Sequence, residues 1–299
     1  MYALAAAALW AGCGTLAKYL FNQGLQPADL VALRLWISSG VLVLALACTN
    51  RRQLILDRSS LGALLVLGFA NTGMQFSYFT AISHTNVATA VFLQYLAPVL
   101  VAVWGSLTRE ETFTRRTAVA LALTTAGIFL LATGGSYRQL AISPAGLCSG
   151  LVAAGFFAAY TVFSRRRLSS SHPVTVLTYV LLVSALLWSL YRPPWRLDPA
   201  WAATTPALAV GSIGVLGTVL PFWFYLRSLG LLPATHTITT STTEPLLGLV
   251  LAYALLGETM LLGQLSGGLL ILGAIGILAG GRHLQPGRLA VGFHRRTGA

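Results

Sequence analysis

Ten apolar segments, separated by short polar connections, account for most of the chain. Each is close to the ~20 residues that cross roughly 30 Å of hydrocarbon as a helix. No alternating pattern of barrel strands appears, and a helix satisfies its own backbone hydrogen bonds in lipid. The pattern therefore predicts an all-α membrane protein with ten transmembrane helices. The expected helices cover residues 2–20, 28–48, 60–82, 86–106, 116–134, 143–164, 173–191, 206–229, 234–256 and 263–280.

Composition leads to the same class. Hydrophobic residues make up 56% of the 299 residues and charged residues only 9%, whereas roughly 25% of a soluble domain is charged. The formal charge is +12, but the basic residues fall between apolar segments, so no nucleic-acid partner is expected. The three cysteines lie in apolar segments without metal-ligand spacing, and no nucleotide-binding P-loop is present. We therefore expect no metal and no cofactor.

The basic residues also predict an orientation. With the N-terminus in the cytoplasm, fourteen Lys and Arg residues fall in inward loops and the tail, and five fall on the outer side. Cytoplasmic loops carry such an excess, so both termini are expected inside. The first segment lacks the basic start of a secretory signal and is expected to remain as a helix. Residues 282–299 are expected to form a basic cytoplasmic tail.

The chain repeats itself at a spacing of 146–147 residues. The matches are Trp10–Lys18 with Phe157–Arg165, Pro27 with Pro173, Ala88-Thr89 with Ala234-Thr235, Pro98 with Pro245, and Glu111-Thr112 with Glu258-Thr259. Each copy holds five expected helices, an odd number, so the second copy enters the membrane inverted. The loop TREETFTRR carries three arginines and its partner LGETMLLGQ carries none, as inversion requires. We predict two inverted five-helix repeats, 1–135 and 143–281, an architecture typical of secondary transporters.

Several segments resemble a known family. ALWAGCGTLAK, PADLVALRL, TNVATAVFLQYLAPVLVAVWGSLTREE and the stretch from PATHTITTSTTEP to LLILGAIGI are similar to the drug/metabolite transporter superfamily, and within it to the ten-helix EamA type. The resemblance covers about residues 1–281. It implies a carrier of the bacterial inner membrane, commonly an exporter of amino acids, metabolites or drugs. Arg115 and Arg116 depart from the second copy, which has apolar or amide residues there, and this fits an inward loop.

Glu244 is the first candidate for transport chemistry because it lies roughly 15 Å deep in its segment. An intramembrane charge is costly and indicates function, either proton or cation coupling or contact with an amine. The alternative is a protonated carboxyl group that closes a kink beside Pro245. The polar run 239–244 suits a water-filled cavity, and Pro245 frees the carbonyl of Ser241. With its repeat partner Pro98, it marks two interrupted helices and hence the expected binding site.

Two cations and several aromatic or amide side chains complete the candidates. Lys18 and Arg34 either extend to lipid headgroups or line an outer vestibule and attract a carboxylate. Trp10, Gln94 and Tyr95 fall in the repeated stretches, and the alternative for them is helix packing. A carboxylate contact and an amine contact together would suit an amino acid. The predicted substrate-binding residues are Trp10, Lys18, Arg34, Gln94, Tyr95, Tyr160, Ser241 and Glu244, with Asn71, Gln75, Tyr78, Trp223 and Tyr225 as further candidates.

Other residues are expected to serve structure. Glu111 and Glu258 precede helices, where a carboxylate accepts free backbone amides. Small residues permit close helix contact within a monomer or between two copies, so both a monomer and a homodimer are open. These glycines are Gly127, Gly267, Gly268, Gly273 and Gly276.

Two alternatives to a coupled carrier remain. An uncoupled facilitator would use the same fold without a coupling ion. The element Glu110-Glu111-x-x-x-Arg115 matches the EExxxR element of CAAX-type membrane proteases, but the five histidines are scattered, without an HxxxH or HExxH pair. We therefore expect a transporter and not an enzyme. Its expected partners are a small-molecule substrate, lipid and, if it is coupled, a proton.

Overall fold

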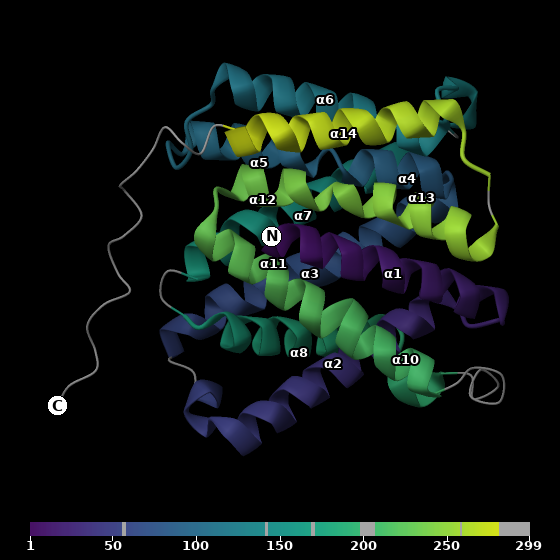
Figure 1. The fold of residues 1–299 in the computed structure, drawn as a ribbon. Helices are drawn as coiled ribbons and strands as arrows, with labels where there is room; N and C mark the ends of the chain where they lie inside the picture. The colour runs from purple at the N-terminus through teal and green to yellow at the C-terminus, as the bar shows by residue number, and fades with distance from the viewer. Residues whose placement is uncertain (56–57, 141–142, 169–170, 198–206, 258, 281–299) are drawn as a thin grey trace.

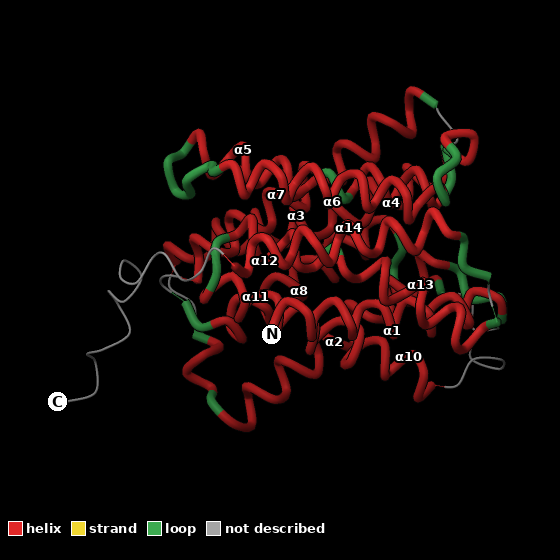
Figure 2. The backbone as a smooth tube through the Cα atoms, turned by 45° about the horizontal axis from the view of Figure 1, so that its top comes forward, coloured by secondary structure: helices red, strands yellow, loops and turns green. Residues whose placement is uncertain are grey.

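The computed structural model describes residues 1–55, 58–140, 143–168, 171–197, 207–257 and 259–280. Helices form the body of the protein, and these residues contain no strand (Figure 2). The N-terminal half contains α1 (Tyr2–Asn22), α2 (Pro27–Thr49), α3 (Arg58–His84), α4 (Val87–Gln94), α5 (Ala97–Leu107) and α6 (Arg115–Thr133). The C-terminal half contains α7 (Pro144–Leu168), α8 (Pro173–Tyr191), α10 (Ala207–Gly214), α11 (Leu220–Leu231), α12 (Ala234–Ser241), α13 (Thr243–Leu256) and α14 (Leu262–Gly280).

The apolar segments coincide with these helices. Each expected segment corresponds to one helix or to helices joined end to end, with boundaries that agree within four residues. Eight such units in the described part of the chain are long and apolar enough to cross a membrane. They are α1, α2, α4 with α5, α6, α7, α8, α10 through α11, and α14. The prediction of an all-α integral membrane protein is confirmed.

The two halves interleave instead of standing side by side as separate bodies. α3 packs against α7, α8 packs against α2, and α1 packs against α13 and α11. In Figure 1, α1 runs from left to right while α14 runs back from right to left across the top. The interior of the bundle is therefore an interface between the halves.

Two helices are broken near the middle of the bundle. α4 ends at Gln94 before α5 begins at Ala97, and α12 ends at Ser241 before α13 begins at Thr243. A proline lies just after each break. Proline has no backbone N–H, so the carbonyl four residues earlier loses its helical donor, and this favours a break there. Pro98 is the second residue of α5, and Pro245 is the third residue of α13.

A second acid, besides Glu244, lies within one of the predicted apolar segments, 28–48. Asp29 lies in the first turn of α2, is 1% exposed, and forms an ion pair with Arg192 at the end of α8. A carboxylate there complements the positive end of the helix dipole. Asp29 therefore joins α2 to α8 at the end of the bundle and has a structural explanation.

Glycines set the crossing of α6 and α14. A Cβ atom on Gly127 would lie 2.7 Å from the Gly267 oxygen, and one on Gly267 would lie 2.6 Å from the Gly127 oxygen. Gly268 packs in the same way against Leu246. Gly273 and Gly276 have open space where a Cβ would stand. Close packing within the monomer therefore explains the first three glycines, whereas the last two leave a homodimer contact open.

We expect Gly267→Ala to destabilise the protein by about 1–3 kcal/mol, the range for overpacking a well-packed contact. The backbone oxygen of Gly127 cannot move away without shifting α6. Gly273→Ala, on the same helix, is the matched control and should be neutral or slightly stabilising because alanine favours helix. Thermal unfolding of the detergent-solubilised protein measures both, and equal melting temperatures for the two variants would contradict this account of the crossing.

Candidate functional site

A cavity of about 830 Å³ lies inside the bundle between the two halves. It is lined mainly by α1, α2, α3, α4 and α13, and it begins at the middle of the bundle beside Trp10 and Tyr225. It extends to Lys18 near the end of α1 and to Val87 at the start of α4. Lining residues at these helix ends place its mouth at one end of the bundle.

An acid and a phenol from the two helix breaks meet in this cavity. The Tyr95 hydroxyl, directly after α4, donates a 2.8 Å hydrogen bond to Oε2 of Glu244, in the first turn of α13. Tyr95 is nearly buried, while Glu244 retains access to the cavity. This hydrogen bond therefore joins the break between α4 and α5 to the start of α13 after the break that follows α12.

A cation faces the same space from α2. Arg34 is half-buried, and its Nη2 donates to Oε1 of Gln75 on α3. Its Nε is buried and has no hydrogen-bond partner among the described residues. Arg34 and Glu244 line the same cavity, and no direct ion pair joins them among the described residues. Arg34 therefore keeps one buried donor unsatisfied while its guanidinium lines the cavity.

Aromatic side chains form the floor of the cavity. Trp10 of α1 packs edge-on against Phe222 of α11, with ring centroids 5.2 Å apart, and lies 5.6 Å from Tyr225. Tyr160 of α7 contacts both α11 rings, at 5.9 and 6.5 Å. Phe157, the repeat counterpart of Trp10, lies 6.2 Å from Tyr225. The floor separates the cavity from the other end of the bundle.

The structure brings most predicted site residues to this cavity. Trp10, Lys18, Arg34, Gln94, Tyr95, Tyr160 and Glu244 line it, as do Gln75, Tyr78 and Tyr225. Ser241 does not line it, because its buried hydroxyl donates back to the carbonyl of Ile238. The roles of these residues in transport stay predictions.

The polar run before Glu244 has a different environment from the water-filled cavity expected. Thr239 through Thr243 are buried, and the hydroxyls of Thr240 to Thr243 donate to carbonyls of the preceding turn. Threonine and serine hydroxyls commonly satisfy such carbonyls in helices. These hydroxyls are therefore satisfied within their own helix, in a hydrogen-bonding pattern that is associated with helix bending.

Glu111 caps a helix, but not the one that follows it. α6 is capped by Thr114, whose hydroxyl accepts from the Thr117 amide. The Glu111 carboxylate instead accepts from the amides of Ala234, at 2.5 Å, and Thr235, at 3.3 Å, at the start of α12. The sequence predicted the interaction with a helix N-terminus but assigned it to the adjacent helix, because a pattern along the chain shows only local neighbours. Glu258 lies outside the described residues, as does the tail 282–299.

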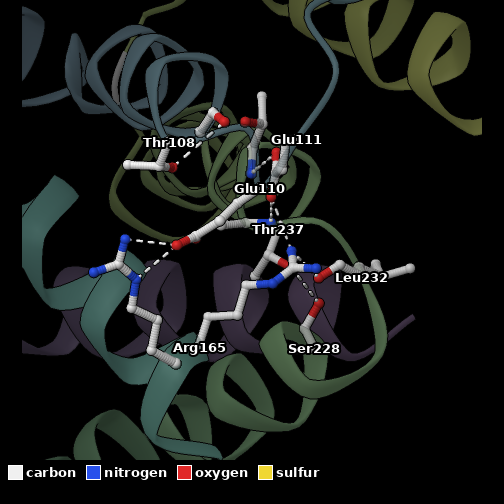
Figure 3. Close-up of polar contacts among 11 residues, drawn as sticks. Thr108, Glu110, Glu111, Arg165, Ser228, Leu232 and Thr237 are labelled. Carbon is white, nitrogen blue, oxygen red and sulfur yellow. Dashed lines mark hydrogen bonds and ion pairs between the residues drawn. The ribbon is translucent and has the colours of Figure 1, made fainter. Parts of the chain in front are cut away.

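Figure 3 shows Arg165 of α7 reaching toward Glu111 and Leu232. Its Nη1 lies 2.8 Å from Glu111 Oε1 and donates at 2.9 Å to the Leu232 carbonyl. The side chains of Arg165 and Glu111 are 22% and 14% exposed. One carboxylate thus joins the turn after α5 to α7 and α12, at the end of the bundle opposite the cavity mouth.

The neighbouring Glu110 forms a separate, more exposed pair with Arg166 at 2.5 Å. The turn that carries both acids contains Arg109 with φ +57°, and the Glu111 amide donates to the Gly105 carbonyl. Each of the two acids of the EExxxR element is therefore paired with an arginine of α7.

The family model described as "EamA-like transporter family" matches residues 1–133 and again residues 144–280. The chain belongs to the EamA-like transporter family. The resemblance seen in the sequence is confirmed. The model matches twice, once on each half of the chain, which agrees with the internal repeat of the sequence.

Individual EamA relatives extend over most of the chain. The uncharacterised inner membrane transporter YicL of Salmonella typhimurium is 26% identical over 91% of this chain and 92% of its own length. An uncharacterised transporter of Archaeoglobus fulgidus is 30% identical, covering 88% and 90%. The threonine/homoserine exporter RhtA of Escherichia coli K12 is 28% identical, covering 88% and 84%. A crystal structure of another protein, with 19% identity, superposes with a TM-score of 0.78 over 95% of this chain and 98% of that one, which shows a shared fold.

Two residues of this EamA protein make contacts that the sequence pattern does not indicate. Gln75, the partner of Arg34, was only a secondary candidate, because an amide in a helix gives no signal of its orientation. Arg165 was counted only as a loop charge, although its match to Lys18 in the repeat could have identified it.

Proposed function

We propose that this protein is a secondary transporter that exports a small zwitterionic metabolite, such as an amino acid, by alternating access around the cavity. The observation that carries the proposal is the presence of opposite charges, Arg34 and Glu244, in one cavity. A substrate carboxylate would bind the Arg34 guanidinium, and a substrate ammonium would bind Glu244. Charge-assisted hydrogen bonds of this kind are the stronger class. The relative named a threonine/homoserine exporter supports the same substrate class.

The proposed scaffold has ten membrane spans in two inverted five-helix repeats, 1–135 and 143–281. The two spans beyond the eight most apolar ones would be α3, which carries polar residues such as Asn71 and Gln75, and the broken unit α12–α13. The sequence repeat and the double match of the family model support this arrangement. Inverted repeats bind substrate near the midplane at the repeat interface and expose it to each side in turn.

The proposed orientation places both termini in the cytoplasm of a bacterial-type inner membrane. Its support is the excess of Lys and Arg in the predicted inward loops. In this orientation the cavity opens outward, and the end with Glu111 and Arg165 is cytoplasmic. An uncoupled facilitator stays the alternative to a proton-coupled exporter, and the Glu244 variant described in the Discussion separates them.

A second candidate is export of larger amphipathic compounds, including drugs. The cavity volume of about 830 Å³ lies within the ~300–1,000 Å³ typical of sites for drug-sized ligands. The aromatic floor of Trp10, Phe222 and Tyr225 offers apolar surface that a small polar amino acid would not use. Strong inhibition of amino-acid flux by aromatic amines would favour this broader specificity.

The proposed function is tested with three matched compounds in proteoliposomes. We expect counterflow of a neutral amino acid such as threonine to exceed that of the corresponding primary amine and of the corresponding acid without the amino group by about tenfold or more. The reason is that each analogue loses one charge-assisted contact worth ~1.5–3 kcal/mol. Empty liposomes provide the control. Equal flux of the amine or the acid would contradict recognition of a zwitterion.

A further inference from the structure

The end of the bundle opposite the cavity mouth is closed by contacts between the two halves. The cavity ends at the aromatic floor. At that closed end, Glu111 from the N-terminal half meets Arg165 and the first amides of α12 from the C-terminal half. α12 continues through its break into α13, which carries Glu244. One broken helix therefore connects the closed end with the cavity.

Buried hydroxyls lie between α7, α11 and α12, from the floor toward Glu111. The hydroxyls of Thr161 and Tyr225 are 2.7 Å apart, and those of Ser228 and Thr237 are 3.0 Å apart. Ser164, one turn from Tyr160, is fully buried, and its hydroxyl has no hydrogen-bond partner among the described residues. We call these residues the hydroxyl seam. A permanent plug would be built from apolar side chains, because burying polar groups costs free energy, whereas paired hydroxyls can exchange their partners for water or a polar substrate.

The sequence repeat relates this closed end to the cavity mouth. Arg165 corresponds to Lys18, and Ala234 corresponds to Ala88. Lys18 and Ala88 both line the cavity on its open side. Equivalent positions therefore lie at the closed end in one half and at the cavity mouth in the other. Alternating access would exchange these two states, so that the closed end opens and the mouth closes.

We propose that Glu111 and Arg165 are the gating residues of the closed end, and that the hydroxyl seam becomes the second half of the transport path when they separate. Glu111 holds α7 and α12 together because one carboxylate binds the Arg165 guanidinium and two α12 amides. The partial exposure of both side chains, 14% and 22%, lets water replace these contacts. The proposal rests on the proposed transport function but concerns residues outside the cavity.

Thiol labelling tests the gate without any substrate. Cys13, Cys48 and Cys148 are replaced by alanine, and Ser228→Cys places a reporter in the hydroxyl seam. A charged, membrane-impermeant methanethiosulfonate is applied to vesicles of either orientation. In Glu111→Gln and Arg165→Gln, we expect the labelling rate from the Arg165 side to rise about tenfold or more, because each loses a charge-assisted contact.

Glu110→Gln is the matched control, since it removes the neighbouring exposed pair with Arg166 and should leave the rate unchanged. Arg165→Lys retains the charge and should stay nearer the wild-type rate. Size-exclusion profiles show which variants fold. Glu111→Gln and Arg165→Gln each change one partner of the same ion pair, so either folded variant tests the gate. Folded Glu111→Gln or Arg165→Gln protein that labels at the Glu110→Gln rate would overturn the gate. The labelling experiment uses no substrate. Its result therefore stays valid if the amino-acid flux assay fails, and the two failures can be told apart.

Discussion

Arg34→Met is expected to reduce amino-acid transport by about ten- to a hundredfold, because the substrate carboxylate loses its charge-assisted donor, worth ~1.5–3 kcal/mol. The cavity keeps its shape, since methionine has a similar length and packs well in irregular spaces. The substitution leaves the buried Gln75 Oε1 without its Arg34 donor, so a size-exclusion profile first checks that the variant folds. The measurement is initial uptake into proteoliposomes at low substrate concentration.

Two variants make the Arg34 prediction specific. Lys18→Met removes the exposed cation at the cavity mouth and should lower the rate far less, since long-range attraction in water is weak and screened. Arg34→Lys keeps the charge but not the planar fork that reaches both Gln75 and a carboxylate, and we expect an intermediate rate. If Arg34→Met transports amino acids as well as the wild type does, Arg34 does not bind the carboxylate.

Glu244→Gln is expected to abolish accumulation driven by a pH gradient while leaving some counterflow. Glutamine keeps the size of the side chain and can still accept the Tyr95 hydroxyl at the position of Oε2. It cannot gain or lose a proton, so a coupled cycle loses its coupling group. The assay compares uptake into proteoliposomes with and without an imposed pH gradient.

Tyr95→Phe is the companion variant, because it removes the hydrogen bond and leaves the carboxyl group in place. Uptake in this variant should remain responsive to the gradient at a reduced rate. Wild-type flux that ignores the pH gradient would make the protein a facilitator. Unchanged gradient-driven uptake in Glu244→Gln would remove Glu244 from the coupling mechanism.

Residues already informative along the chain account for much of the site. Glu244, Pro98 and Pro245 were conspicuous because a charge or a proline inside an apolar segment has few structural explanations. Tyr95 was selected through the repeat, and the structure places its hydroxyl on Glu244. Ser241 is a candidate because Pro245 frees its carbonyl, but its hydroxyl turns to its own helix, which the pattern alone does not reveal.

By itself, the sequence determined the class, the helices and the family. A segment of about 20 apolar residues has one favourable form in lipid, a helix that satisfies its own hydrogen bonds, so local composition was sufficient. The repeat and its motifs identified the EamA family, now confirmed by the family model over both halves.

Only the tertiary structure decided which polar groups share a space. Arg34 and Gln75 come from different helices, and Glu111 meets α12 across more than 120 residues of chain. Such contacts depend on how helices rotate and cross, which is set by close approaches such as Gly127 to Gly267 and by the breaks before Pro98 and Pro245. A hydrophobic pattern positions each helix in the membrane, but in lipid it carries little information about which neighbour each polar side chain will meet.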